Sequence, residues 1–260
     1  MEVGVLALLV GAGFIASFID SQVGGGGVIT LPAYLLAGLP PQIALGTNKV
    51  GGTASALVAS VNYLRSGAVP LRRALLLVPL SMLGGAIGVW AVLHSSSCIK
   101  ACSATADLPW LTSAVMAVMG VMMVYVLVRP RFGMEDKLVA GALPMLAMAI
   151  AALDIGTYDG ILGPGTGSML LFAIVSFLGY GFRRAAALGR VLNLGSNLSS
   201  VTYYIIAGRV DWSVAAPMAV SMGIGGWVGS HVTLKHGDRW LKPLFVVITL
   251  ALLVRLFLQL

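Results

Sequence analysis

The sequence predicts an all-α polytopic membrane protein of about ten transmembrane helices, arranged as two inverted-topology five-helix repeats. Three observations predict this: an apolar composition, a series of helix-length apolar runs, and an internal repeat. Of the 260 residues, 58% are hydrophobic and only 10% are charged, whereas soluble domains carry about 25% charged residues. The polar breaks between the apolar runs are short, so we expect no separate soluble domain.

Ten apolar runs follow one another along the chain, and most approach the roughly 20 residues that a helix needs to cross a bilayer. The second and seventh runs are much shorter, which indicates either broken spans or segments that turn back within the membrane. The runs cover residues 3–19, 28–39, 42–64, 73–93, 110–128, 138–157, 167–179, 184–206, 212–234 and 240–258.

The basic residues choose between these topologies. With ten crossings and an extracytoplasmic N-terminus, almost every basic loop is cytoplasmic, and only Lys100 and Arg209 lie clearly outside. If both short runs turned back, this bias would largely disappear. The positive-inside rule therefore favours ten crossings with both termini extracytoplasmic. The residues placed in cytoplasmic loops are Arg65, Arg72, Arg73, Arg129, Arg131, Lys137, Arg183, Arg184, Lys235, Arg239 and Lys242.

The net charge of +7 does not indicate nucleic-acid binding, because the basic residues are confined to short loops and form no face that could track phosphates. Cys98 and Cys102 fall in a loop that this topology places outside. A disulfide and two unpaired thiols both remain open there. One cysteine pair without nearby histidines or acids does not predict a metal site, and we expect no metal and no cofactor.

The chain repeats itself. Asp20 precedes the glycines of "IDSQVGGGG", and Asp159 precedes those of "YDGILGPGTG", 139 residues later. From Lys49 onward the spacing is 141 residues, which aligns Lys49 with Arg190 and "GGAIG" at Gly84 with "GGWVG" further on. One two-residue insertion reconciles the two spacings. Glycines at random positions would seldom align in this way, so the sequence predicts an internal duplication.

Residues 1–128 form the first predicted repeat, 129–137 a cytoplasmic linker and 138–260 the second repeat. Because each half has an odd number of spans, the second copy enters the membrane from the opposite face. Inverted repeats of this kind are typical of secondary transporters. They place the substrate site near the midplane, where equivalent interrupted helices meet.

Lys49 and Arg190 are the strongest candidates for that site. Each lies well inside a span, where a cation costs roughly 2.5–3.5 kcal/mol on insertion scales. One interpretation is structural, with each cation paired to Asp20 or Asp159. The other is an anion site that takes one cation from each half.

The glycine stretches fit the second interpretation. A helix that starts at Val28 or Gly167 directs unpaired N–H groups and a positive dipole end toward its preceding loop. Glycine also lets a ligand approach the backbone closely. Small residues equally serve helix packing, which is the role we expect for the motifs at Gly84 and Gly225. The predicted substrate-binding residues are Lys49, Arg190, Asn48, Gly24, Gly25, Gly26, Gly27, Gly165, Thr166, Gly167, Asn193 and Asn197.

Asp20 and Asp159 are poor anion ligands when ionised. A buried carboxyl group can hold a proton near physiological pH, so these two acids could carry a coupling proton. The alternative is structural, with each acid capping its short helix or pairing with the neighbouring cation. Polar side chains nearby could bind ligand oxygens or join helices. They are Thr47, Asn48, Thr166, Ser168, Asn193, Ser196 and Asn197.

"FIDSQVGGGGVITLPAYLLAGLPPQIALGTNKV" in the first half, with "YDGILGPGTGSMLL" and "ALGRVLNLGSNLSS" in the second, resembles the TauE/SafE family of membrane permeases. The similarity covers nearly the whole chain. Family members are described as exporters of sulfite or small organosulfonates in bacteria and archaea. The resemblance thus implies an oxyanion substrate and a multi-pass protein of a prokaryotic plasma (inner) membrane. The family motif supports Asp20, Gly24 to Gly27, Pro32, Asn48, Lys49, Asp159, Gly163, Pro164, Gly165, Gly167, Arg190, Asn193 and Asn197.

The sequence therefore predicts a secondary transporter that exports a small sulfur-containing anion by alternating access, with proton coupling left open. A passive anion channel is the alternative. An intramembrane aspartyl protease is disfavoured, because that chemistry needs two carboxylates sharing a proton without matched cations. No nucleotide-binding loop is present, and no enzymatic activity is expected. The expected partners are the anionic substrate and the lipid bilayer, with a homodimer left open and nucleic acid excluded.

Overall fold

The computed structural model describes residues 3–94, 120–122, 124–129, 131–139 and 141–257. Regular structure within those residues is entirely α-helical, which confirms the predicted all-α class. Cys98, Cys102 and the first part of the run at 110–128 lie outside the described residues, and a helical stretch is described within 120–128. The labelled helices are α1 (Val3–Val23), α2 (Gly27–Leu36), α3 (Pro41–Arg65), α4 (Leu71–His94), α7 (Ala142–Ile161), α8 (Thr166–Leu178), α9 (Phe182–Ile206), α10 (Trp212–His236) and α11 (Asp238–Phe257).

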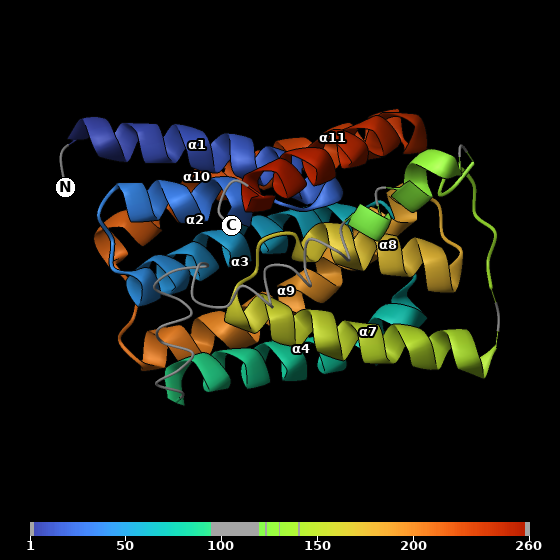
Figure 1. The fold of residues 1–260 in the computed structure, drawn as a ribbon, viewed down its shortest axis with the longest axis horizontal. Coiled ribbons are helices and arrows are strands. Elements are labelled where there is room, and N and C mark those ends of the chain that lie inside the picture. Colours follow the sequence, from blue (N-terminus) through green and yellow to red (C-terminus); the bar gives the residue numbers. More distant parts are fainter. Residues whose placement is uncertain (1–2, 95–119, 123, 130, 140, 258–260) are drawn as a thin grey trace.

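The two short runs form the returning arms of two helical hairpins (Figure 1). In that view α1 and α2 enter the bundle from the end that carries the N-terminus, and α7 and α8 enter from the opposite end. α2 has 10 residues and α8 has 13. At 1.5 Å per residue they extend only about 15–20 Å, less than the roughly 30 Å of a hydrocarbon core.

Each of these short helices therefore covers part of a membrane thickness, which confirms that the second and seventh apolar runs form short or broken helices. The cause is the glycine break, which lies in the interior of the bundle rather than at its surface. The outer ends of α2 and α8 still lie where ten crossings would place them, at opposite ends of the bundle (Figure 1). The predicted side of every described loop is consequently unchanged.

Three described helices, α1, α4 and α7, are both long and apolar enough to cross a membrane. The long helices α3 and α9 are less apolar because polar side chains are buried along them, including Ser55, Asn193 and Ser200. Large apolar side chains such as Leu75 and Leu143 are instead exposed on the outside. Apolar residues outside and polar residues inside are the arrangement of a polytopic membrane protein.

Two buried apolar clusters fill the bundle around this polar interior. One gathers on α8 and α9 and includes Leu170 and Phe182. The other gathers on α2, α3 and α10 and includes Tyr34, Leu45 and Met218. The polar side chains between them therefore lie in a frame of rigid, well-packed helices.

The repeat is visible in the helix packing. Gly84 of α4 touches the backbone of α7 at Leu153, and Gly225 of α10 touches the backbone of α1 at Phe14. A Cβ atom at either glycine would collide with the facing helix. The glycines are 141 residues apart and their contacts 139, the same spacings as in the sequence. These motifs are packing faces, as predicted, while the exact limits of the two repeats stay a prediction.

Candidate functional site

The tips of the two hairpins meet inside the bundle. Gly24, in the break between α1 and α2, lies directly against the backbone of Gly167 at the start of α8. The Ser168 hydroxyl donates to the Val23 carbonyl oxygen at 2.8 Å, which ties the two tips together. Gly24 and Gly165 have φ angles of +82° and +86°, a left-handed conformation that favours glycine. The sequence thus needs glycine here both for the backbone turn and for the close approach.

Lys49 of α3 forms the first buried ion pair of the site. Its Nζ lies 3.0 Å from Oδ1 of Asp159 on α7, and the two side chains are 4% exposed. Nζ also donates to the Asp159 main-chain oxygen at 2.5 Å. The carboxylate accepts two further hydrogen bonds, from Thr166 Oγ1 at 3.1 Å and from Ser196 Oγ at 2.7 Å. Every charge of this pair therefore has a polar partner.

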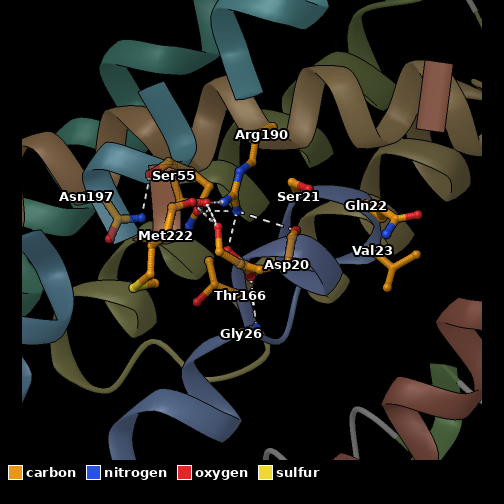
Figure 2. Close-up of polar contacts among 12 residues, drawn as sticks. Asp20, Ser21, Gln22, Val23, Gly26, Ser55, Thr166, Arg190, Asn197 and Met222 are labelled. Carbon is orange, nitrogen blue, oxygen red and sulfur yellow. Dashed lines mark hydrogen bonds and ion pairs between the residues drawn. The ribbon is translucent and has the colours of Figure 1, made fainter. Parts of the chain in front are cut away.

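Arg190 of α9 forms the second pair, with Asp20 near the end of α1 (Figure 2). Nη1 donates to Asp20 Oδ2, and Nη2 donates to Ser55 Oγ at 2.5 Å. Asp20 Oδ1 accepts from the Gly26 amide at 3.0 Å, at the start of α2. Arg190 Nε is buried and has no hydrogen-bond partner within the described part of the chain. One guanidinium donor therefore stays available.

The two ion pairs cross between the halves of the protein. Lys49 of the first half binds the acid of the second, and Arg190 of the second half binds the acid of the first. Both acids are therefore paired with a cation, and Asp20 also bonds the start of its short helix; whether either carries a coupling proton stays a prediction. Each pair joins a hairpin from one half to a long helix of the other, so any rearrangement between the halves must change these contacts.

A small polar cavity lies at the first pair. Its volume is about 40 Å³, and Asp20, Asn48, Lys49, Asp159 and Asn193 are among its lining residues. A second hollow of about 10 Å³ lies beside Arg190. At 10–15 Å³ per water, the first holds about three waters and the second about one. A sulfonate does not fit either without movement, so this arrangement is closed.

The structure brings most of the predicted site residues together. Gly27, Asn48, Thr166, Gly167 and Asn197 line the larger cavity. Among the remaining glycines, Gly25 has a φ of +100° in the turn before α2. The exception among the polar candidates is Thr47, whose hydroxyl accepts from the Asp211 amide at 3.1 Å, next to the start of α10 and away from the cavity.

Asn193 and Asn197 lie one helical turn apart on α9, beside both ion pairs. Asn193 Oδ1 accepts from Arg190 Nη1 at 3.3 Å, and the Asn197 side chain donates to the Asn193 main-chain oxygen at 2.8 Å. Asn48 Oδ1 accepts from Thr30 Oγ1 of α2 at 2.6 Å. The Asn48 bond joins α3 to α2, whereas the bonds of Asn193 and Asn197 lie within α9. The role of these amides as substrate ligands stays a prediction.

Sequence reasoning missed Ser55, which binds Arg190 from α3. The signal that could have found it is the repeat spacing, because Ser55 lies 141 residues before Ser196, the serine that binds Asp159. Within the described residues no three histidine, cysteine, aspartate or glutamate side chains gather as metal ligands. The site thus contains two buried cations and two acids among neutral hydrogen-bonding groups.

Opposed hairpins with glycine breaks, meeting at buried charges in an apolar helical bundle, define the class of protein as a membrane transporter. The model of the family "Sulfite exporter TauE/SafE" matches residues 9–256, and the chain belongs to that family. A "Probable membrane transporter protein" of Haemophilus influenzae is 35% identical over 251 residues, covering 96% of this chain and 94% of its own. No solved structure gives a significant match.

Two further relatives match this chain over almost the same number of residues. The "Probable membrane transporter protein ORF9" of a Sinorhizobium species is 36% identical over 252 residues, 96% of this chain and 92% of its own. The "Probable membrane transporter protein YfcA" of Escherichia coli K12 is 30% identical over 252 residues, 96% of this chain and 89% of its own. The whole chain is thus similar to membrane transporters.

Proposed function

We propose that this protein is a secondary transporter that exports a small sulfur-containing oxyanion, sulfite or a small organosulfonate, across a prokaryotic plasma membrane by alternating access. The observation that carries the proposal is the pair of buried cations, Lys49 and Arg190, one from each half and both at the meeting point of the hairpin tips. Secondary transporters with inverted repeats bind anions at interrupted helices in this position.

The substrate class follows from the donors that surround the site. A sulfite or sulfonate group presents three oxygens, which suit the fork of Arg190, the ammonium of Lys49 and the amides at the starts of α2 and α8. The free Nε of Arg190 adds a donor without breaking an existing bond. The name of the family, sulfite exporter, supports the same class.

The crossed ion pairs suggest how the site alternates. In the closed arrangement each cation holds an acid of the opposite half, which locks the two hairpins against α3 and α9. An anion that enters competes with the carboxylates for Lys49 and Arg190. The competition weakens the contacts between the halves at the moment of binding, so the halves can rock about the occupied site.

Charge balance at the two ion pairs supports proton coupling. The four ionised side chains of the two pairs sum to zero, and a bound monovalent anion would leave an uncompensated negative charge in the membrane interior. Protonation of Asp20 or Asp159 restores neutrality and frees its cation for the anion. The charged groups that face these acids are Arg190 on α9 and Lys49 on α3. We therefore propose that one proton binds with each monovalent anion.

Calorimetry on the purified protein tests the anion site. We would titrate sulfite, sulfate, chloride and methanesulfonate into the wild type and into Lys49→Gln and Arg190→Gln. Arg184→Gln is the matched control, since Arg184 lies in an ion pair whose side chains are 44% and 35% exposed. We expect saturable binding of sulfite or methanesulfonate that is lost in both site variants and kept in the control. Unchanged binding in the site variants would reduce these cations to structural partners.

Flux measurements in vesicles separate a transporter from a passive anion channel. Alternating access predicts that substrate on the opposite side accelerates the exit of labelled substrate, because the loaded site returns faster than the empty one. A channel shows no such exchange, and its flux does not saturate at the concentrations that saturate binding. No proteolytic step is proposed, because both acids are engaged with cations rather than with each other.

A further inference from the structure

The linker between the two halves folds against the end of α8. The Lys137 amide donates to the Gly179 oxygen at 2.7 Å, and the Phe182 amide donates to the Gly133 oxygen at 2.8 Å. Asp136 accepts from the Gly181 amide at 2.8 Å. These bonds fix the linker as a strap beside the loop between α8 and α9. It lies at the end of the bundle that carries most of the described basic residues, called the basic end below.

A cavity of about 420 Å³ opens between this strap, the helical stretch before it and the end of α8. Its volume is in the range of small-molecule sites, about 300–1,000 Å³. One wall is apolar and aromatic, formed by Tyr125, Val128, Phe132, Val175 and Tyr180. It is about ten times larger than the polar cavity between the hairpin tips.

The other wall of this cavity is basic. Arg129, Arg131 and Lys137 line it, and Glu135 is the only acid among its lining residues within the described chain. The Arg129 guanidinium lies 5.4 Å from the centre of the Tyr125 ring. Burial raises the pKa of the Tyr180 phenol, so this ring stays neutral. The lining thus carries three cations and one acid beside an uncharged wall.

The apolar wall continues onto the outer surface of the bundle. Val128 is 73% exposed and Tyr125 is 39% exposed, and neighbouring Val124 is 56% exposed. In a membrane protein such side chains face lipid. The cavity therefore joins a lipid-facing apolar surface to a cluster of cations at the basic end. A ligand that matches both parts carries an anionic head and an apolar tail.

We propose that this cavity binds an anionic phospholipid of the adjacent leaflet. The headgroup phosphate meets Arg129, Arg131 and Lys137, and the first carbons of an acyl chain lie on Val128, Tyr125 and the side of Val175. Basic pockets on the cytoplasmic side of membrane proteins bind anionic headgroups by this combination. A free phosphate would use the cations and leave the apolar wall empty. The proposal does not depend on the proposed transport function.

Native mass spectrometry of the full-length protein tests the site with phosphatidylglycerol and phosphatidylcholine of identical acyl chains. The site variant is the triple change Arg129→Gln, Arg131→Gln and Lys137→Gln. The matched control removes three basic residues of the same end that do not line the cavity, Arg65→Gln, Arg72→Gln and Lys235→Gln. We expect the wild type and control to retain phosphatidylglycerol at least about tenfold over phosphatidylcholine, and the site variant to lose that preference.

A second variant tests the opposite direction. Glu135 is exposed, so Glu135→Gln should leave the fold intact while removing the acid from the lining. We expect its retention of phosphatidylglycerol to rise by several-fold. Glycerol phosphate and inorganic phosphate serve as competitors that lack acyl chains. Equal retention in the triple variant and its control would overturn the proposal. Displacement of the lipid by millimolar glycerol phosphate would overturn it too, because the site would then recognise the phosphate alone.

Discussion

Ser55 and Ser196 lie 141 residues apart in the sequence, and each binds one member of a different buried ion pair. Ser55 Oγ accepts from Arg190 Nη2 at 2.5 Å, whereas Ser196 Oγ donates to Asp159 Oδ2 at 2.7 Å. The same repeat position thus supports a cation in one half and an acid in the other. A hydroxyl suits both tasks because it accepts and donates.

Replacing either serine by alanine should destabilise the fold. Ser55→Ala and Ser196→Ala each remove a hydrogen bond to a buried charge, which is worth about 1.5–3 kcal/mol. Ser60→Ala is the control, since the Ser60 hydroxyl is buried and has no partner within the described residues. Thermal unfolding in detergent should show a lower melting temperature for the first two variants and little change for the third. Equal melting temperatures for all three would contradict the assigned bonds.

The sequence predicted the helical class, the two short helices, the matched glycine breaks and the two buried cations, because each leaves a local signal. Apolar run length predicts a span, and a lone Lys49 inside a span stands out. The sequence did not predict which aspartate forms the ion pair with Lys49 and which with Arg190. That choice depends on how two hairpins from opposite ends interlock, which is a contact between residues 110 and 170 positions apart.

The depth of the glycine breaks within the bundle could not be predicted from the sequence either. The runs at 28–39 and 167–179 gave the lengths of α2 and α8 within a few residues. Hydropathy reports how much of a segment is apolar and carries no information on whether it starts at the surface or in the interior. The sequence therefore predicted that the second and seventh helices are short or broken, but not how deep in the bundle each break lies.

The contact between the hairpin tips predicts that a methyl group at Gly24 or Gly167 is not tolerated. Gly24→Ala adds strain at a φ of +82° and a collision with the backbone of the other tip. These effects cost about 1–3 kcal/mol each. Gly11→Ala is the matched control, because a Cβ at Gly11 of α1 meets nothing within 4 Å. Thermal unfolding should show a clear loss for Gly24→Ala and Gly167→Ala and none for Gly11→Ala.

The Lys49–Asp159 pair predicts a non-additive response to mutation. Lys49→Gln alone leaves a buried carboxylate without its cation, and such single changes cost about 3–5 kcal/mol. The double variant Lys49→Gln with Asp159→Asn removes both charges, so most of that stability should return. Arg184→Gln, in an exposed pair, should cost at most about 1 kcal/mol.

Chemical denaturation of Lys49→Gln, Asp159→Asn, the double variant and Arg184→Gln, beside the wild type, measures this cycle. The informative result is the recovery in the double variant, and it should come without recovery of anion binding. Additive losses would mean that the two side chains do not interact in the folded protein. Recovery of anion binding in the double variant would mean that Lys49 is not a ligand.

Charge balance predicts that anion binding takes up protons. Methanesulfonate keeps one negative charge at all pH values of interest, so any pH dependence of its binding belongs to the protein. Protonation of Asp20 or Asp159 removes a negative charge from the site and frees a cation, which strengthens binding as the pH falls. If one proton binds with each anion, affinity changes by up to about tenfold per pH unit while the acids are ionised in the empty protein.

Calorimetry in buffers of different ionisation enthalpy counts those protons directly, because the observed heat then varies with the buffer. We expect close to one proton per anion in the wild type. Asp20→Asn and Asp159→Asn each remove one candidate acid, and the proton count should fall in the variant that lacks the coupling acid while the anion still binds. A buffer-independent heat in the wild type would leave binding intact and reject proton coupling. If both variants still take up one proton per anion, a group other than Asp20 and Asp159 binds the coupling proton.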